Sequence, residues 1–244
     1  MNLKAIAFDV NGTLIEIVTE DDMSEIFRAI GHFLTYQGID LRRHQVRDLY
    51  FQTMKEQQKS SPEPHPEFDA VGIWRTIIQE YATDYTRVLP AAKIEQLPTV
   101  LAEMYRGISR RRLALYPHVR EVLDILRLDY RLAVVTDAQS AYARAELNKA
   151  GLLDYFDPIV VSGDYGFRKP DKRLFQAALN TIGALPEDTI YIGNDMHRDI
   201  YGAQKAGMKA VMFNSDQGTK EYRETAPDYE IDDYRQLLDI VASL

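Results

Sequence analysis

The chain contains 244 residues, and its 45% hydrophobic and 27% charged residues are ordinary for a globular protein with a substantial core. Acidic residues outnumber Lys and Arg by 37 to 29, and the resulting charge of −8 disfavours a sequence-independent grip on nucleic-acid phosphates. The lack of cysteine excludes disulfides, Cys-based zinc sites and thiol catalysis. No apolar stretch reaches the roughly 18–20 residues of a membrane span, and residues 1–20 lack a signal-peptide layout, so we expect a cytoplasmic protein.

The first predicted strand ends in a carboxylate. The apolar run Ile6-Ala7-Phe8 leads directly into Asp9, and a glycine turn follows at Gly12. A carboxylate at the end of a buried strand is costly as packing but useful as a nucleophile or a metal ligand. We therefore expect a functional site at Asp9.

Residues 15–112 keep a helical period in their apolar positions, with no strand-like run between them. Four helical stripes are expected around residues 23–34, 46–54, 73–81 and 101–108. Residues 60–66 carry three prolines at alternate positions and predict an extended loop. The Arg110-Arg111-Arg112 cluster is interpreted as a solvated helix end. The segment 15–112 is thus predicted to be an all-helical insert.

From Leu113 onward, helix-like and strand-like segments alternate. Strands are expected at residues 132–135, 158–161, 190–192 and 210–213, each after a helix. Together with the first strand they make five, which suits an α/β fold with a doubly wound, Rossmann-type parallel sheet. Residues 1–14 and 113–244 are predicted to form this core, and residues 15–112 a separate helical domain.

Polar residues directly follow several of these strands. Asp9, Thr136, Ser162 and Asn194 each come at such a point. In an open parallel sheet, ligands bind outside the carboxyl ends of the strands, so these side chains are expected to surround one crevice.

Four motifs in order resemble those of the haloacid dehalogenase-like hydrolase superfamily, over nearly the whole chain. They are Asp9-x-Asn11-Gly12-Thr13-Leu14, Thr136, Lys169-Pro170 and Gly193-Asn194-Asp195-x-x-x-Asp199-Ile200. The resemblance implies that residues 15–112 are a helical cap of that superfamily's first type. It also implies that Asp9 is a nucleophile that forms an aspartyl-phosphate and that Thr136 holds the phosphoryl oxygens. Lys169 would be the cation that neutralises the nucleophile and the transferred phosphate.

The resemblance further implies a Mg²⁺ cofactor. Asp195 and Asp199 match the acidic fourth motif, and Asp9 with the main-chain carbonyl of Asn11 would complete the protein ligands. Asn194 stands where the family usually has the first acid of that motif. Either Asn194 through its amide oxygen or the neighbouring Asp195 can take that acid's place, and the sequence leaves both open.

A second departure lies at Asn11, where phosphatases of the family usually carry an Asp that serves as acid and base. An amide cannot exchange a proton at neutral pH, so a rate loss on the order of 10²–10⁴ is expected. Activated esters should therefore be the better substrates.

The resemblance favours a hydrolase of small phosphate monoesters, with a small phosphorylated molecule as partner and neither nucleic acid nor membrane. A 2-haloacid dehalogenase, without metal, is the alternative, since its members also have a neutral residue at the Asn11 position. A phosphate-ligand-binding protein with almost no turnover is a third interpretation. Tyr36, Tyr50 and Trp74 could line a substrate pocket, but their helical spacing favours a core. The sequence carries no signal for the oligomeric state.

Overall fold

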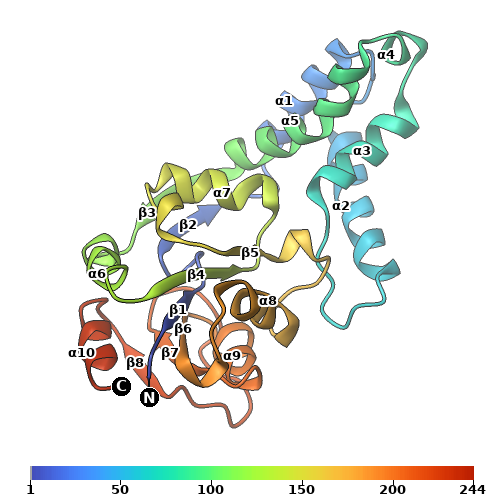
Figure 1. Ribbon diagram of the computed structural model, residues 1–244. Coiled ribbons are helices and arrows are strands. Elements are labelled where there is room, and N and C mark those ends of the chain that lie inside the picture. The colour runs from blue at the N-terminus through green and yellow to red at the C-terminus, as the bar shows by residue number, and fades with distance from the viewer. Residues whose placement is uncertain (1) are drawn as a thin grey trace. The chain divides into compact units, whose positions relative to one another are not determined.

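The computed structural model describes residues 2–244, which divide into two compact units (Figure 1). The first unit runs up to Ile17 and continues through Leu113–Leu244, and the second comprises Val18–Arg112. Within residues 2–244, no helix has both the length and the apolar composition needed to cross a membrane.

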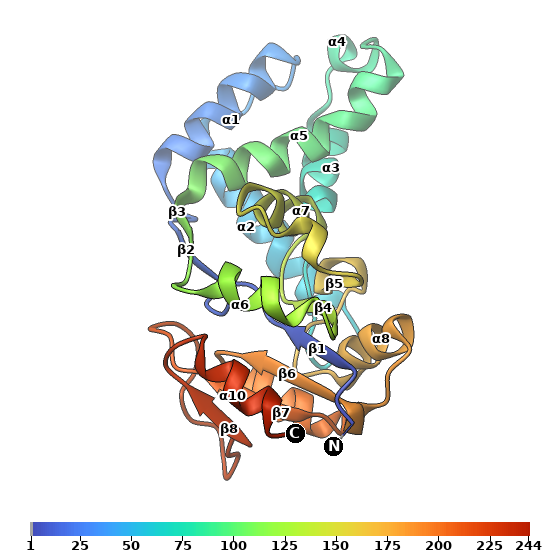
Figure 2. The ribbon, with the colours of Figure 1, turned by 60° about the vertical axis from the view of Figure 1, so that its left-hand side comes forward.

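Six strands of the first unit form one parallel sheet, in the order β5-β4-β1-β6-β7-β8. Their bounds are Ala5–Phe8 (β1), Arg131–Thr136 (β4), Ile159–Val161 (β5), Thr189–Gly193 (β6), Lys209–Phe213 (β7) and Tyr229–Ile231 (β8). The first strand of the chain therefore lies inside the sheet, between β4 and β6 (Figure 2). This order places the carboxyl ends of β1, β4 and β6 side by side.

The predicted count of five strands was wrong by one. The missed strand β8 has only three residues, Tyr229-Glu230-Ile231, and only Ile231 is buried. Such a short edge strand carries no periodic signal in the sequence.

Helices cover both faces of the sheet, so the predicted doubly wound α/β fold is confirmed. They are α6 (Val119–Leu126), α7 (Ser140–Lys149), α8 (Lys172–Ile182), α9 (Gly202–Lys205) and α10 (Gln236–Ala242). Residues of α6, α7 and α10 share one hydrophobic cluster with Ile6 and Phe8, and residues of α8 and α9 share the other with Ala5 and Ala7. Figure 1 shows α6 and α10 on one side of the sheet and α8 and α9 on the other.

The two faces of the sheet differ in side-chain size. On the α6 side the central strands present Ile6, Phe8, Ile190 and Ile192, all buried. On the α8 side they present mostly alanines, which leaves space for the ring of Tyr191. This tyrosine lies opposite Ala7 on β1 and Ala210 on β7.

The second unit contains helices α1 (Ser24–Tyr36), α2 (Arg43–Ser60), α3 (Ala70–Tyr81), α4 (Asp84–Arg87) and α5 (Ala91–Ser109). All four predicted helical stripes are confirmed, as is the extended loop after Ser60. The core is aromatic: Tyr50 stacks on Tyr105 at 4.5 Å between ring centroids and lies 5.0 Å from Trp74. Tyr50 and Trp74 are therefore core residues, whereas Tyr36 is exposed.

The expectation that residues 15–112 lack strands was wrong at both ends of that segment. Strands β2 (Ile15–Thr19) and β3 (Arg110–Leu115) form a two-stranded sheet. Alternation of Ile15 and Ile17 with polar residues is typical of a half-buried strand but is too brief to stand out. The Arg110–Arg112 cluster is the start of β3 and not a helix end, because α5 ends at Ser109.

Candidate functional site

Asp9 leaves the central strand at its carboxyl end and is buried. Its amide continues the ladder by donating to the Ile192 carbonyl of β6 at 2.9 Å. The chain then turns through Gly12, whose φ is +81°, and the amide of Leu14 donates back to the Val10 carbonyl. A Cβ at Gly12 would lie 2.3 Å from Nδ2 of Asn194, so only glycine fits where the turn meets β6.

Lys169 joins the two acids of the site. Its Nζ donates to Oδ1 of Asp9 at 2.8 Å, to Oδ1 of Asp199 at 2.5 Å and to the hydroxyl of Tyr191 at 3.1 Å. The Lys169 side chain is 2% exposed. Burial alone would lower its pKa, but the carboxylates of Asp199 and Asp9 outweigh burial and raise the pKa of Lys169 above its usual value. The lysine is therefore a permanent positive charge beside Asp9.

Thr13 connects Asp9 with Asn194. Its hydroxyl lies 3.2 Å from Oδ2 of Asp9 and 3.1 Å from Oδ1 of Asn194. A threonine hydroxyl has one hydrogen, so it donates to one of these oxygens at a time. One hydroxyl group thus contacts side-chain oxygens of both Asp9 and Asn194.

Both carboxylate oxygens of Asp199 are in contact with hydrogen-bond donors. Its Oδ1 is bonded by Lys169 and lies 3.1 Å from the Tyr191 hydroxyl, while its Oδ2 accepts from the amides of Asn194 and Asp195 at 3.1 and 3.0 Å. A carboxylate offers about four acceptor positions, so these contacts saturate it.

Asp195 is saturated in the same way, by different partners. Its Oδ1 accepts from the amides of His197 and Arg198, at 3.0 and 2.8 Å, and caps the turn Met196–Tyr201. Its Oδ2 accepts from the Thr219 amide and the Arg198 guanidinium, each at 2.9 Å. Although burial opposes it, this hydrogen bonding lowers the pKa of Asp195 to about 2. The Asp195 side chain is committed to the backbone of two loops and to Arg198.

Three buried polar atoms at the carboxyl ends of the strands have no hydrogen-bond partner. They are Oγ1 of Thr136, the last residue of β4, Oδ2 of the next residue, Asp137, and Oδ1 of Asn11. An unpaired buried polar atom costs about 1–3 kcal/mol, and such atoms in a native site call for a ligand or water. Thr136 and Asn11 are residues that the sequence placed in the site.

Within residues 2–244, no group of three or more His, Asp or Glu side chains is arranged to hold a metal ion. Of the metal ligands that the sequence implies, those with spare acceptor capacity are the Asp9 carboxylate, Oδ1 of Asn194 and Oδ1 of Asn11. All are hard oxygen donors, the kind that Mg²⁺ binds while keeping several waters.

Tyr191 and Thr219, which lies in the loop between β7 and β8, are not among the site residues predicted from the sequence. A tyrosine inside the otherwise aliphatic run Ile190-Tyr191-Ile192, facing alanines on both neighbouring strands, was the available signal for Tyr191. The approach of Thr219 to Asp195 depends on a loop that returns after β7, which no local pattern specifies. Arg168, next to Lys169 in the chain, is partly exposed, and its Nε lies 3.5 Å from Oδ2 of Asp137.

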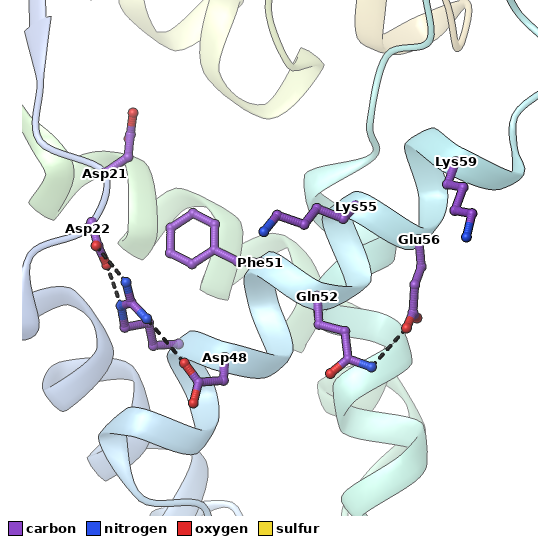
Figure 3. A pocket seen from close by; sticks show the side chains of 9 residues that line it. Asp21, Asp22, Asp48, Phe51, Gln52, Lys55, Glu56 and Lys59 are labelled. Atoms are coloured by element: carbon purple, nitrogen blue, oxygen red, sulfur yellow. Dashed lines mark hydrogen bonds and ion pairs between the residues drawn. The ribbon is translucent and has the colours of Figure 1, made fainter.

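The second unit has a cavity of its own, of about 750 Å³, between Asp21 and α2 (Figure 3). Arg47 forms a two-pronged ion pair with Asp22 at 2.5 and 2.7 Å and also bonds Asp48. Phe51 and Lys55 line the middle of this cavity. None of the site residues predicted from the sequence belongs to it.

Comparison with known proteins finds phosphatases of similar sequence and a dehalogenase of similar fold. The chain is 32% identical to a glyceraldehyde 3-phosphate phosphatase of Methanothermobacter thermautotrophicus over 161 residues, covering 63% of this chain and 71% of that one. It is 36% identical to a phosphoserine phosphatase of Thermus thermophilus over 131 residues, covering 53% of this chain and about half (52%) of that one. A 2-haloacid dehalogenase structure from Pseudomonas syringae superposes with a TM-score of 0.68 at 22% identity, covering 99% of each chain.

A family model described as haloacid dehalogenase-like hydrolase matches residues 6–213, which include every predicted site residue. The resemblance inferred from the motifs is therefore confirmed, together with the expectation of a hydrolase. The chain belongs to the haloacid dehalogenase-like hydrolase family.

Proposed function

We propose that the protein is a phosphatase that hydrolyses a small phosphate monoester through an aspartyl-phosphate on Asp9. The observation that carries this proposal is the pairing of the buried Asp9 carboxylate with the equally buried Lys169 at 2.8 Å. The phosphatase names of the relatives at 32% and 36% identity support it.

In the first step an oxygen of Asp9 attacks phosphorus, and the bond from phosphorus to the leaving oxygen breaks. Lys169 neutralises the Asp9 carboxylate and the incoming phosphoryl group together. The unpaired hydroxyl of Thr136 supplies a hydrogen bond to a phosphoryl oxygen. In the second step water attacks the same phosphorus, which releases inorganic phosphate and restores the carboxylate.

Asn11 limits both steps. Its side-chain amide can neither protonate the leaving oxygen nor accept a proton from the attacking water at neutral pH. The leaving group must therefore depart with its own charge, and water must attack without a base from this position. We expect turnover to be on the order of 10²- to 10⁴-fold slower than in an enzyme with an acid at the position of Asn11.

Mg²⁺ is the proposed cofactor. Asp9, Asn194 and Asn11 would hold it, because their oxygens retain free acceptor positions. Asp195 and Asp199 already accept hydrogen bonds on both oxygens, so they would position the neighbouring groups without binding the cation. When bound, the cation supplies positive charge to the phosphoryl oxygens and offsets the negative charge of Asp9.

The helical unit Val18–Arg112 is proposed to be a cap of the family's first type. The proposed partner of the enzyme is a small phosphorylated molecule.

Steady-state hydrolysis of 4-nitrophenyl phosphate, with and without Mg²⁺, tests the proposal. We expect slow, Mg²⁺-dependent turnover by the wild type, none by Asp9→Asn, and a 10²-fold or greater increase in kcat for Asn11→Asp. Absence of turnover in every variant would reject the phosphatase proposal.

A 2-haloacid dehalogenase is the second candidate, favoured by the neutral Asn11 and by the saturation of both acids of the fourth motif. Asp9 would then displace halide from carbon to form an ester, which water would hydrolyse. Halide release from 2-chloropropionate without metal would support it. Tight phosphate binding without either reaction would indicate a binding protein.

A further inference from the structure

We propose that Tyr191 is a positioning residue whose hydroxyl holds the ammonium group of Lys169 against Asp9. The inference rests on the proposed phosphatase function. Tyr191 lies outside the four sequence motifs and takes no part in the two chemical steps described above.

The number of hydrogens on the Lys169 ammonium group determines the direction of its hydrogen bond with Tyr191. An ammonium group has three hydrogens and no acceptor. Its three partners are Oδ1 of Asp9 at 2.8 Å, Oδ1 of Asp199 at 2.5 Å and the Tyr191 hydroxyl at 3.1 Å. The tyrosine must therefore accept the third hydrogen, and the lysine has none left over.

The tyrosine hydroxyl has a fixed place of its own. Its single hydrogen can go to the Val135 carbonyl at 2.9 Å or to Oδ1 of Asp199 at 3.1 Å. Val135 precedes Thr136 on β4, so the first choice ties the lysine to the strand that carries the proposed phosphoryl-binding hydroxyl. In both choices the oxygen still accepts from Lys169.

The ring of Tyr191 is held rigidly enough to act as a support. It is fully buried, and its edge-to-face contact with Phe175 has a centroid distance of 5.0 Å. The residues opposite it on the neighbouring strands, Ala7 and Ala210, have small side chains, which leave space for the ring. A rigid ring fixes the hydroxyl, and the hydroxyl fixes the third direction of the ammonium group.

Loss of the hydroxyl would leave Lys169 with two carboxylates and one unpaired hydrogen in a buried site. The ammonium group would turn toward its shorter contact, Asp199, and away from Asp9. Because a displacement of about 1 Å can cost 10²-fold in rate, we expect kcat to fall by about 10- to 100-fold. The charge of Lys169 and the proposed bond from the Thr136 hydroxyl to a phosphoryl oxygen both remain, so KM should stay within about twofold.

The test uses Tyr191→Phe in the full-length protein, with Tyr155→Phe as the matched control. The control removes a hydroxyl of the same unit that donates to Oδ1 of Asp124 at 2.8 Å. Both variants are assayed with 4-nitrophenyl phosphate and Mg²⁺ for kcat and KM, and with orthovanadate and inorganic phosphate as inhibitors. For Tyr191→Phe we expect a lower kcat, an unchanged KM, vanadate inhibition weakened by the same factor as kcat, and unchanged phosphate inhibition.

Tyr155→Phe should match the wild type in all four values. A kcat of Tyr191→Phe within twofold of wild type would overturn the inference, as would a parallel loss of kcat and of phosphate binding, which indicates a structural defect. If the phenylalanine variant does not fold, Tyr191→Met removes the hydroxyl with a flexible apolar side chain and is judged by the same criteria. An inactive wild type would reject the proposed function itself, whereas an active wild type with an unaffected Tyr191→Phe rejects only the positioning role.

Discussion

Hydrogen-bond saturation separates the acidic side chains of the site into two groups. Asp195 and Asp199 each accept bonds on both oxygens from backbone amides and from a cation. Asp9 and the Asn194 amide oxygen share only one hydroxyl, that of Thr13, besides the contact of Asp9 with Lys169. Free acceptor positions, and not the number of acids in a motif, therefore select the proposed cation ligands.

Two single substitutions at the neighbouring residues Asn194 and Asp195 test which of them binds the cation. Asn194→Asp adds a negative charge at a proposed ligand, and we expect it to lower the Mg²⁺ concentration for half-maximal activity by about tenfold, because ligand charge sets the affinity of such sites. Mg²⁺ titration of steady-state activity measures the effect.

Asp195→Asn is the matched control, since it removes one charge at the adjacent residue. We expect its Mg²⁺ requirement to stay within about twofold of wild type, whereas its stability should fall by about 1 kcal/mol through the weakened bonds to Arg198. A large rise in the Mg²⁺ requirement of Asp195→Asn would show that Asp195 is a ligand after all.

At the scale of elements, two turns close on Asn194. One is the turn after β1, at Gly12, and the other is the loop after β7, at Gly218. Gly218 has a φ of +81°, and a Cβ there would lie 2.4 Å from the Asn194 carbonyl. Both turns depend on glycine for this close approach, Gly12 to the side chain of Asn194 and Gly218 to its backbone carbonyl.

Gly218→Ala should therefore destabilise the protein by about 1–3 kcal/mol and lower activity, because the loop would shift and release Thr219 from Asp195. Gly107→Ala is the control: it lies in α5 with no neighbouring atom within 4 Å of the added Cβ, and should stabilise by about 0.5–1 kcal/mol. Thermal unfolding of both variants measures these changes. Equal effects of the two substitutions would contradict the role given to the Gly218 turn.

The elements that the sequence predicts well are those with long patterns. The buried run at residues 132–135 and the helical stripe at 174–182 both appear as expected, in β4 and α8. Two short elements were not predicted: α4, which has four residues, and β8, which has three. The motifs likewise predict which residues gather around Asp9. They do not predict that Asp195 accepts a hydrogen bond from the Thr219 amide, because that bond joins residues 24 positions apart through a loop without a sequence pattern.

At the scale of the whole molecule, the central position of the first strand explains how distant residues form one site. Asp9 lies between the ends of β4 and β6, so Thr136 and Asn194 flank it although the segment 18–112 interrupts the chain. Every predicted site residue belongs to the first unit. The proposed chemistry can therefore be assembled within that unit.

The central claim, a covalent intermediate on Asp9, is tested most directly by trapping it. The wild type is mixed with 4-nitrophenyl phosphate and Mg²⁺, quenched in acid and analysed by intact-mass and peptide mass spectrometry. Because Asn11 cannot activate water, we expect one phosphoryl group on the peptide that contains Asp9, at higher occupancy than in Asn11→Asp, and none in Asp9→Asn. Turnover without a phosphoryl adduct, or an adduct that persists in Asp9→Asn, would contradict this account.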